Sequence, residues 1–240
     1  MPYAQQLLAL AQKARETVSN HPAASGSLRI GSLPSTAAVR LPEILKAFFA
    51  HCHNVDVAVE TGTATELTAR VMDYRVDGAF VSGPVNHAEL NAVPAFVEEL
   101  VLLTPLAWPS VAKYLASTPI PKVLVFQPGC FYRQKLEAYL SRAGAAQLNE
   151  MEFGTLDGII GCVSAGLGIT MLPRSVIVAS GRRRQVRIHE LPREASRVET
   201  LFITHQAQVV SSALERLIEV IVVGRKRTEQ RPSQVQVERG

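Results

Sequence analysis

LRIGSLPSTAAVRLPEILKAFFAHCHNVDVAVETGTATELTARVMDYRVDGAFVSGPV, residues 28–85, is the stretch that decides the fold of this 240-residue chain. It reads as two strand–helix units followed by a third strand. Alternating strands and helices joined by short turns imply a parallel sheet with right-handed crossovers, so we predict an α/β protein. The expected strands are 28–31, 55–60 and 78–81, and the expected helices cover about 36–51 and 65–74.

The turns that lead into both helices are rich in hydroxyl side chains. Free backbone N–H groups at a helix start, together with the helix dipole and short hydroxyl side chains, form a site for a carboxylate or another small anion. Two such starts in one sheet indicate a ligand cradle rather than a catalytic centre. The hydroxyl residues are Ser32, Ser35 and Thr36 before the first helix and Thr61, Thr63 and Thr65 before the second.

The rest of the chain extends the pattern into a second lobe. An apolar strand ends at Thr104-Pro105, where we expect a crossover, and a strand at 200–204 returns the chain to the first lobe. Two crossings form a hinge beside a cleft, a common place for small ligands. The second lobe is expected to hold strands at 122–126, 149–153, 168–172 and 186–191 and helices over 132–143 and 156–165. The predicted division is therefore 28–104 and 200–224 in the first lobe and 105–199 in the second.

The two ends of the chain differ from this pattern. Residues 3–20 are predicted to form a helix with one narrow apolar seam of coiled-coil type. Pro22 and Gly26 break that helix, so residues 1–27 are predicted to be a linker and dimerisation element. After a helix over 210–222, the charged and polar residues 225–240 are predicted to be disordered. The seam consists of Leu7, Ala11, Ala14 and Val18.

Composition favours a globular protein of the cytoplasm. The hydrophobic content is 47% and the formal net charge is +4, with much of the positive charge in the runs 182–184 and 225–227. Such runs are usually solvated surface. The first 20 residues lack the apolar core of a secretory signal, and no apolar run reaches the roughly 18–20 residues that span a bilayer, so we expect no membrane contact. Three widely spaced cysteines indicate no disulfide framework.

Sequence motifs of catalysis and of cofactor binding are not found. The chain has no GxSxG elbow, no HExxH, no Walker A motif and no GxGxxG after a strand, so we predict neither an enzyme nor a cofactor. His51, Cys52 and His53 invite interpretation as metal ligands. Residues adjacent in sequence seldom converge on one ion, and histidine at a helix C-terminus complements the dipole, so we favour a structural role and predict no metal site.

The chain resembles the effector-binding (regulatory) domain of LysR-type transcriptional regulators over about residues 28–222. The resemblance rests on the opening LRIGS, the stretch LPEILKAFFAHCHNVDVAVETGT, the strand DGAFV, the turn QPGCFYRQKLEAYL and above all FGTLDGIIGCVSAGLGITMLPRSV. It implies two Rossmann-like lobes joined by two crossovers, the fold of type 2 periplasmic binding proteins. It also implies a domain that senses a small organic effector and controls transcription through a homodimer or homotetramer.

The DNA-reading part of that family is a winged helix-turn-helix, which does not precede residue 28. The helix over 3–20 resembles part of the linker helix that dimerises such regulators. We therefore expect this chain to be a fragment of a longer regulator, whose contact with DNA is made through the missing N-terminal domain. In the family, regulatory domains often pair side by side and antiparallel. Leu41, Leu45 and Phe49 are candidates for that face, and burial within the lobe explains them equally well.

The resemblance implies a set of effector-binding residues around the cleft. Hydroxyls and backbone amides would hold a carboxylate, and Phe131 and Phe153 would cover an apolar body, so a compact organic acid is favoured; no arginine is placed in the cleft. The first lobe would contribute Ser32, Ser35, Thr36, Thr61, Gly62 and Thr63, the second lobe Gly129, Cys130, Phe131, Phe153, Gly154 and Thr155, and the returning strand Thr204.

Two alternatives stay open at this point. Cys130 follows a turn before a helix, where the dipole lowers a thiol pKa, so it is either a redox switch that would pair with Cys162 or a small cleft residue. The whole chain is either a regulator domain or a transport-type solute-binding protein of the same fold. Oligomeric state separates these two, because transport receptors are usually monomers.

Overall fold

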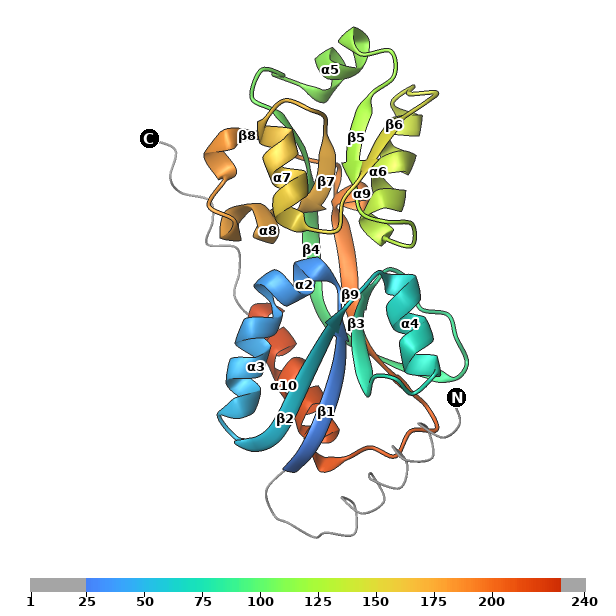
Figure 1. Cartoon of the computed structure of the whole chain (residues 1–240), viewed down its shortest axis with the longest axis vertical. Coiled ribbons are helices and arrows are strands. Elements are labelled where there is room, and N and C mark those ends of the chain that lie inside the picture. Colours follow the sequence, from blue (N-terminus) through green and yellow to red (C-terminus); the bar gives the residue numbers. More distant parts are fainter. Residues whose placement is uncertain (1–24, 230–240) are drawn as a thin grey trace.

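The computed structural model describes residues 25–229, which form two lobes stacked along the long axis of the molecule (Figure 1). The predicted α/β fold with two lobes and two crossovers is confirmed. The predicted helix over 3–20 lies outside the described residues, and so do residues 230–240. In the described part of the chain, no helix is both long enough and apolar enough to cross a bilayer.

Lobe I is the half of the molecule around the first three strands. Strand β1 lies between β2 and β3 and is parallel to both, as the strand–helix alternation predicts. Its complete elements are β1 (Ser25–Ser32), α2 (Pro34–Val39), α3 (Leu41–Phe49), β2 (Asn54–Thr61), α4 (Ala64–Met72), β3 (Gly78–Ser82) and α10 (Ser212–Glu229).

Lobe II is the other half. Strands β5 and β6 are parallel, and Val123 of β5 forms a bridge to Ile169, just before β7. Its complete elements are α5 (Val111–Ser117), β5 (Lys122–Val125), α6 (Phe131–Arg142), β6 (Asn149–Glu152), α7 (Leu156–Ser164), β7 (Thr170–Pro173), α8 (Arg174–Ala179), the 3-10 turn η1 (Arg183–Gln185), β8 (Val186–His189) and α9 (Arg193–Ser196).

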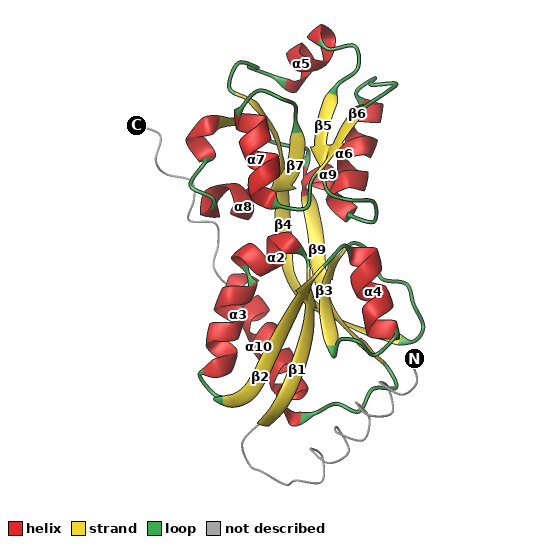
Figure 2. Ribbon diagram, in the orientation of Figure 1, coloured by secondary structure: helices red, strands yellow, loops and turns green. Residues whose placement is uncertain are grey.

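Two long antiparallel strands, β4 (Leu90–Pro105) and β9 (Arg197–His205), run between the lobes (Figure 2). Strand β4 pairs with β9 as far as Glu99 and with β7 and β8 from Leu100 onward. The crossovers are therefore continuous strands rather than loops. The predicted lobe boundaries at 104/105 and 199/200 stay predictions, since both strands belong to both lobes.

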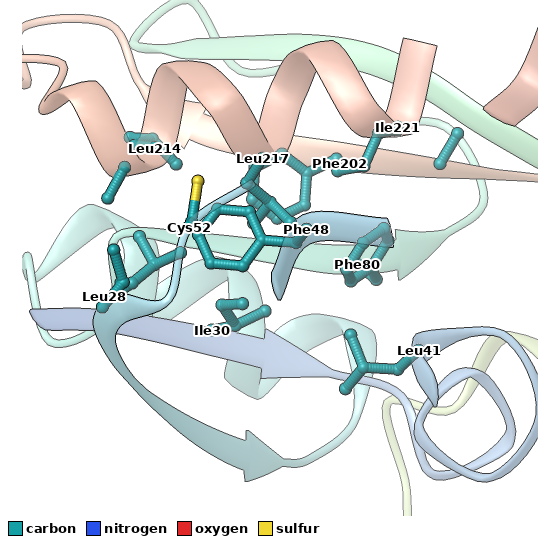
Figure 3. Close-up of a cluster of buried hydrophobic side chains, with 13 residues drawn as sticks. Leu28, Ile30, Leu41, Phe48, Cys52, Phe80, Phe202, Leu214, Leu217 and Ile221 are labelled. Atoms are coloured by element: carbon teal, nitrogen blue, oxygen red, sulfur yellow. The ribbon is translucent and has the colours of Figure 1, made fainter. Parts of the chain in front are cut away.

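The sheet of lobe I is covered on both faces. Leu28 and Ile30 of β1 share a buried cluster with Phe48 of α3 and Leu217 of α10, which lie between the helices and the strand in Figure 3. On the opposite face, Leu67 of α4 and its neighbours pack in a separate buried cluster with residues of β3. Alternation along each strand sends successive side chains to opposite faces. Lobe II has two clusters of its own.

The single helix predicted over 36–51 is wrong, because two helices, α2 and α3, replace it. They meet at Arg40, and Pro42 lies in the first turn of α3. Proline lacks a backbone N–H and its ring clashes with the carbonyl four residues earlier, so a continuous helix through Pro42 is disfavoured. The break allows α2 to turn across the end of β1 while α3 packs along the sheet.

The predictions for the two ends also need correction. Strand β1 begins at Ser25, inside the predicted linker. At the other end, α10 continues through Gly224 and Arg225–Arg227 to Glu229, so residues 225–229 are helical and the prediction of disorder is wrong for them. Helices α5 and α8 were not predicted. Both are short, and an apolar pattern of one or two turns is hard to separate from a loop.

Candidate functional site

A cleft of about 310 Å³ lies between the lobes. Lobe I contributes the starts of α2 and α4, and lobe II contributes the end of β5, the start of α6 and the turn after β6. Seven of the predicted site residues line it: Ser35, Thr61, Gly62, Thr63, Cys130, Phe153 and Gly154. The other lining residues are Leu33, Pro34, Glu66, Arg70, Phe126, Gln127 and Tyr132.

The start of α2 forms the floor of the cleft on the lobe I side. Leu33 is in extended conformation at the N-cap and Pro34 opens the helix, with no side chain capping the first N–H groups. Proline at this position is pre-organised for helix and lacks an N–H that would be unsatisfied. Ser35 is therefore held at the junction of the lobes with 5% of its surface exposed.

The start of α4 is capped by its own side chains. Thr63 Oγ1 accepts a hydrogen bond from the Glu66 N–H at 3.3 Å, and Glu66 Oε2 accepts from the Thr63 N–H at 2.8 Å. This is a capping box, in which two helix-start donors are satisfied reciprocally. The carboxylate of Glu66 thus occupies part of the anion position that the sequence predicted to be open to a ligand.

Arg70 is a cleft residue that sequence reasoning missed. Its Nη1 donates to Glu60 Oε2 at 3.1 Å and to the carbonyl oxygen of Thr61 at 3.3 Å, which fixes the guanidinium between β2 and α4. The spacing Thr63-x-x-Glu66 and Arg70 one turn later was the available signal, because residues three and four apart share a helix face. The sequence placed no arginine in the cleft, and the structure adds Arg70 to its lining.

Tyr132 is the second missed residue, and its hydroxyl joins the lobes. It lies 3.3 Å from Ser35 Oγ of α2 and 3.4 Å from Ser82 Oγ at the end of β3, and Ser82 Oγ is 3.0 Å from Thr200 Oγ1 of β9. Burial raises the pKa of Tyr132 to about 12, so its hydroxyl stays protonated and can donate. These four residues form the Tyr132 cluster.

Gly129, predicted to line the cleft, lies beside it where lobe II approaches the start of α4. Its φ of +93° lies in the left-handed region, and a Cβ there would sit 3.1 Å from the hydroxyls of both Thr63 and Thr65. A larger residue would be strained and would press on the α4 start. Phe131, predicted to enter the cleft, instead packs on Gly83, where a Cβ would lie 2.8 Å from its ring. One residue later on α6, Tyr132 lines the cleft.

The remaining predicted residues do not line the cleft. Ser32 is fully buried at the end of β1 and donates to the carbonyl of Leu33. Thr36 is buried within α2, and Thr155 caps α7 by accepting from the Gly158 N–H. Thr204 of β9 pairs with Asn91 of β4 and lies about 13 Å further along β9 than Thr200. On β9 it is Thr200 that reaches the junction of the lobes.

Cys130 lines the cleft, but its surroundings favour the protonated thiol over the thiolate. Burial raises the pKa of its thiol, and this outweighs the hydrogen bonds from the backbone of Arg133 and Tyr132, which lower it. The expected lowering by the helix start is therefore wrong in its net direction. Cys130 and Cys162 belong to different core clusters, and both are free thiols. The geometry favours a small cleft residue over a redox pair.

The sequence His51-Cys52-His53 does not gather its side chains. Cys52 is buried in the core of lobe I with its pKa raised by burial, while His51 and His53 are exposed. Within residues 25–229 no group of three or more His, Cys, Asp or Glu side chains is placed to hold a metal ion.

A second polar link between the lobes lies at α2 and α8. Glu98 of β4 is 4% exposed and accepts from Arg40 Nε at 2.7 Å and from the Ser175 hydroxyl of α8 at 2.8 Å. The Arg40 guanidinium also lies 5.3 Å from the centre of the Phe96 ring. Lobe I and lobe II are thus tied to the same strand by one carboxylate.

The sequence matches a known family model and several relatives that are named as HTH-type transcriptional regulators. The model described as the LysR substrate binding domain matches residues 21–223. The HTH-type transcriptional regulator GltR of Bacillus subtilis (strain 168) is 38% identical over 216 residues, which cover 90% of this chain and 73% of the relative. The HTH-type transcriptional regulator SoxR of Arthrobacter sp. (strain TE1826) is 35% identical over 219 residues, covering 91% and 74%.

Solved structures share the fold at lower sequence identity. The effector binding domain of QuiR in complex with shikimate has a TM-score of 0.70 at 17% identity and covers 85% of this chain and 98% of that one. The regulatory domain of CcmR from Synechocystis PCC6803, in complex with 2-PG, has a TM-score of 0.72 at 17% identity, covering 84% and 98%. At this level of identity the likeness establishes the architecture alone.

Proposed function

Because the chain belongs to the LysR substrate-binding domain family, we propose that it senses a small-molecule effector in the cleft between its lobes and transmits occupancy to a transcriptional regulator. The observation that carries the proposal is the cleft itself. It has about 310 Å³ of space and is lined by hydroxyl, charged and aromatic side chains from both lobes. Concave sites of this kind at the junction of two lobes are typical of small-ligand binding.

The effector would act by stabilising one arrangement of the lobes. Ser35 and Tyr132 line the cleft and also contact each other across it. A ligand that contacts both lobes changes the relative populations of lobe arrangements only as far as its affinity differs between them. A ligand in the cleft would thus change the relative orientation of the lobes about β4 and β9, the strands that join them.

The proposed role as part of a transcriptional regulator also suggests which partners the chain has. Characterised relatives are HTH-type transcriptional regulators, so we propose a homodimer or homotetramer whose DNA contact is made by a helix-turn-helix domain outside this chain. A cytoplasmic location belongs to that proposal. A transport receptor is the less favoured alternative, since the relatives regulate transcription. Sedimentation at micromolar concentration separates the two: a dimer or larger assembly supports the regulator, and a strict monomer counts against it.

A thermal-shift screen with a metabolite library, followed by calorimetric titration of the hits, tests the proposal. Ser35→Ala and Thr61→Val remove hydroxyls from the cleft and are expected to weaken effector binding by about tenfold, the value of one lost hydrogen bond. Ser117→Ala, at the exposed end of α5, is the matched control and leaves the affinity unchanged. Hits whose affinity is the same in all variants would contradict a site in the cleft.

A further inference from the structure

The two charged residues that line the cleft have opposite signs. Arg70 and Glu66 are the charged residues of the lining, one turn apart on the same face of α4. Arg70 does not turn toward Glu66. Its Nη1 donates to Glu60 Oε2 at 3.1 Å and to the Thr61 carbonyl, so the guanidinium is held by β2 and is not paired with Glu66.

Glu66 is an exposed carboxylate at the start of α4 that lines the cleft. It accepts the Thr63 N–H through Oε2, and within residues 25–229 it takes part in no ion pair. The facing wall from lobe II consists of Phe126, Gln127, Cys130, Tyr132, Phe153 and Gly154, none of which carries a positive charge. The buried Cys130 thiol and Tyr132 hydroxyl are donors rather than cations.

We infer that the effector carries a protonated amine, which binds to the carboxylate of Glu66. The inference rests on the proposed function and names the ligand class for the same cleft. A carboxylate that has no ion-pair partner among the described residues, and that faces uncharged and aromatic groups, complements a cation. A ligand with two or more carboxylates would place negative charge against Glu66.

The opposite end of the ligand is an acid. Ser35 and Tyr132 offer hydroxyl donors, and Nε and Nη2 of Arg70 make no hydrogen bond to a described residue. A carboxylate accepts from all of these groups. The chemical class is therefore an amino acid or another compact molecule with one ammonium and one carboxylate. The volume of about 310 Å³ is at the small end for ligand sites, which suits a molecule of this size.

Calorimetry with matched compounds tests the ligand class on the chain as it stands. The probes are the standard L-amino acids, the corresponding acids that lack the amino group and the corresponding amines that lack the carboxylate. We expect at least one amino acid to bind about tenfold or more tightly than either of its two truncated partners, because a charge-assisted hydrogen bond exceeds a neutral one.

Two variants test whether the preference for an amino acid over its deaminated partner depends on the carboxylate of Glu66. Glu66→Gln keeps an oxygen that can accept the Thr63 N–H, so α4 stays capped while the charge is lost. We expect it to reduce the preference for the amino acid over its deaminated partner to about twofold or less. Glu43→Gln removes the same charge from the exposed first turn of α3, outside the cleft, and leaves the preference unchanged.

The outcomes separate the ligand class from the proposed function. Deaminated acids that bind as tightly as amino acids, or a preference that survives Glu66→Gln, would overturn the inference. Binding of no amino acid would overturn it as well. In each of these cases the proposed function stands if another metabolite binds with an affinity that Ser35→Ala lowers, and it fails if no ligand depends on Ser35 or Thr61.

Discussion

Tyr132 illustrates how much a single hydroxyl can do at the junction of two lobes. It comes from α6 of lobe II, lines the cleft and contacts Ser35 and Ser82 of lobe I, while Ser82 also contacts Thr200 of β9. In a buried environment each of these hydroxyls needs a partner. The cluster therefore links the ligand site to a strand that joins the lobes.

Tyr132→Phe removes the central hydroxyl and leaves the Ser35 hydroxyl without its partner. We expect the free energy of unfolding to fall by about 1–3 kcal/mol, measured by urea denaturation. Tyr139→Phe is the matched control on the same helix, because its hydroxyl makes no hydrogen bond within the described residues; its effect should stay within about 0.5 kcal/mol. Equal effects of the two changes would show that the Tyr132 cluster adds no stability.

His189 gives lobe II a dependence on pH. Burial and the positive charge of Arg187 lower its pKa, and its Nε2 lies 2.8 Å from the buried Thr104 hydroxyl. The folded state then binds a proton less readily than the unfolded state. Stability is fully present above the ordinary histidine pKa of about 6.5 and is lost as the pH falls through that value toward the lowered pKa.

The prediction for His189 concerns the difference in the free energy of unfolding between the wild type and a variant that lacks the histidine. Urea denaturation between pH 7.5 and about 5 should show the wild type losing stability relative to His189→Gln, which does not titrate. His53→Gln replaces an exposed histidine in lobe I and should follow the wild type. A wild type that gains stability on acidification relative to His189→Gln would contradict the sign of the argument.

Helix α10 is the element that completes the core of lobe I. It comes from the end of the chain, yet Leu214 and Leu217 are fully buried against β1 and α3 (Figure 3). Sequence periodicity predicted this helix but not its length. Gly224 and the basic residues after it read as a tail, whereas the helix continues to Glu229 and Arg225 pairs with Glu199 at 3.0 Å.

Leu217→Ala is expected to lower the free energy of unfolding by about 2–5 kcal/mol, since it removes buried methyl groups and leaves a cavity. Val223→Ala, in the same helix but about half exposed, should cost no more than about 0.5 kcal/mol. Thermal or urea unfolding measures both. A small effect at Leu217 would mean that α10 is not an integral part of the lobe I core.

The elements and the site were predictable to different degrees. Short apolar strands followed by amphipathic helices gave most of the elements to within a few residues, because burial on one face or both faces sets their period. Strand β4 was harder: its first half alternates between buried and exposed residues and its pairing with β9 is non-local. Ser35 and Thr63 could be predicted as cleft residues because both lie in hydroxyl-rich turns that lead into helices.

Cleft residues that depend on side-chain direction were missed. Phe131 and Tyr132 are adjacent at the start of α6, and only the three-dimensional packing on Gly83 decides that Tyr132 enters the cleft. Arg70 reaches the cleft because Glu60, on a neighbouring strand, holds it there. Which side chain enters the cleft is therefore decided by tertiary contacts and cannot be read from the local sequence pattern.

For the molecule as a whole, the two lobes are tied at two places. One is the Tyr132 cluster at the cleft, and the other is Glu98, which accepts from Arg40 of lobe I and Ser175 of lobe II. The first place includes Thr200 of β9, and the second is Glu98 of β4. Any change in the angle between the lobes has to alter one or both sets of contacts.

Glu98→Gln tests the second tie. It removes a buried charge from a hydrogen-bonded ion pair, and we expect a loss of about 1–3 kcal/mol in the free energy of unfolding together with a broader distribution of lobe arrangements in small-angle scattering. Glu99→Gln changes the next residue, whose carboxylate pairs with Arg174 at the surface, and should cost about 0–1 kcal/mol. Equal losses of stability in the two variants would show that Glu98 does not tie the lobes together.

The central claim is that one small molecule is held by both lobes at once. Hydrogen–deuterium exchange, with and without the tightest compound from the metabolite screen, tests it most directly. We predict slower exchange on both sides of the cleft, at residues 61–63 of lobe I and 127–132 of lobe II. Protection confined to a single lobe would contradict the claim.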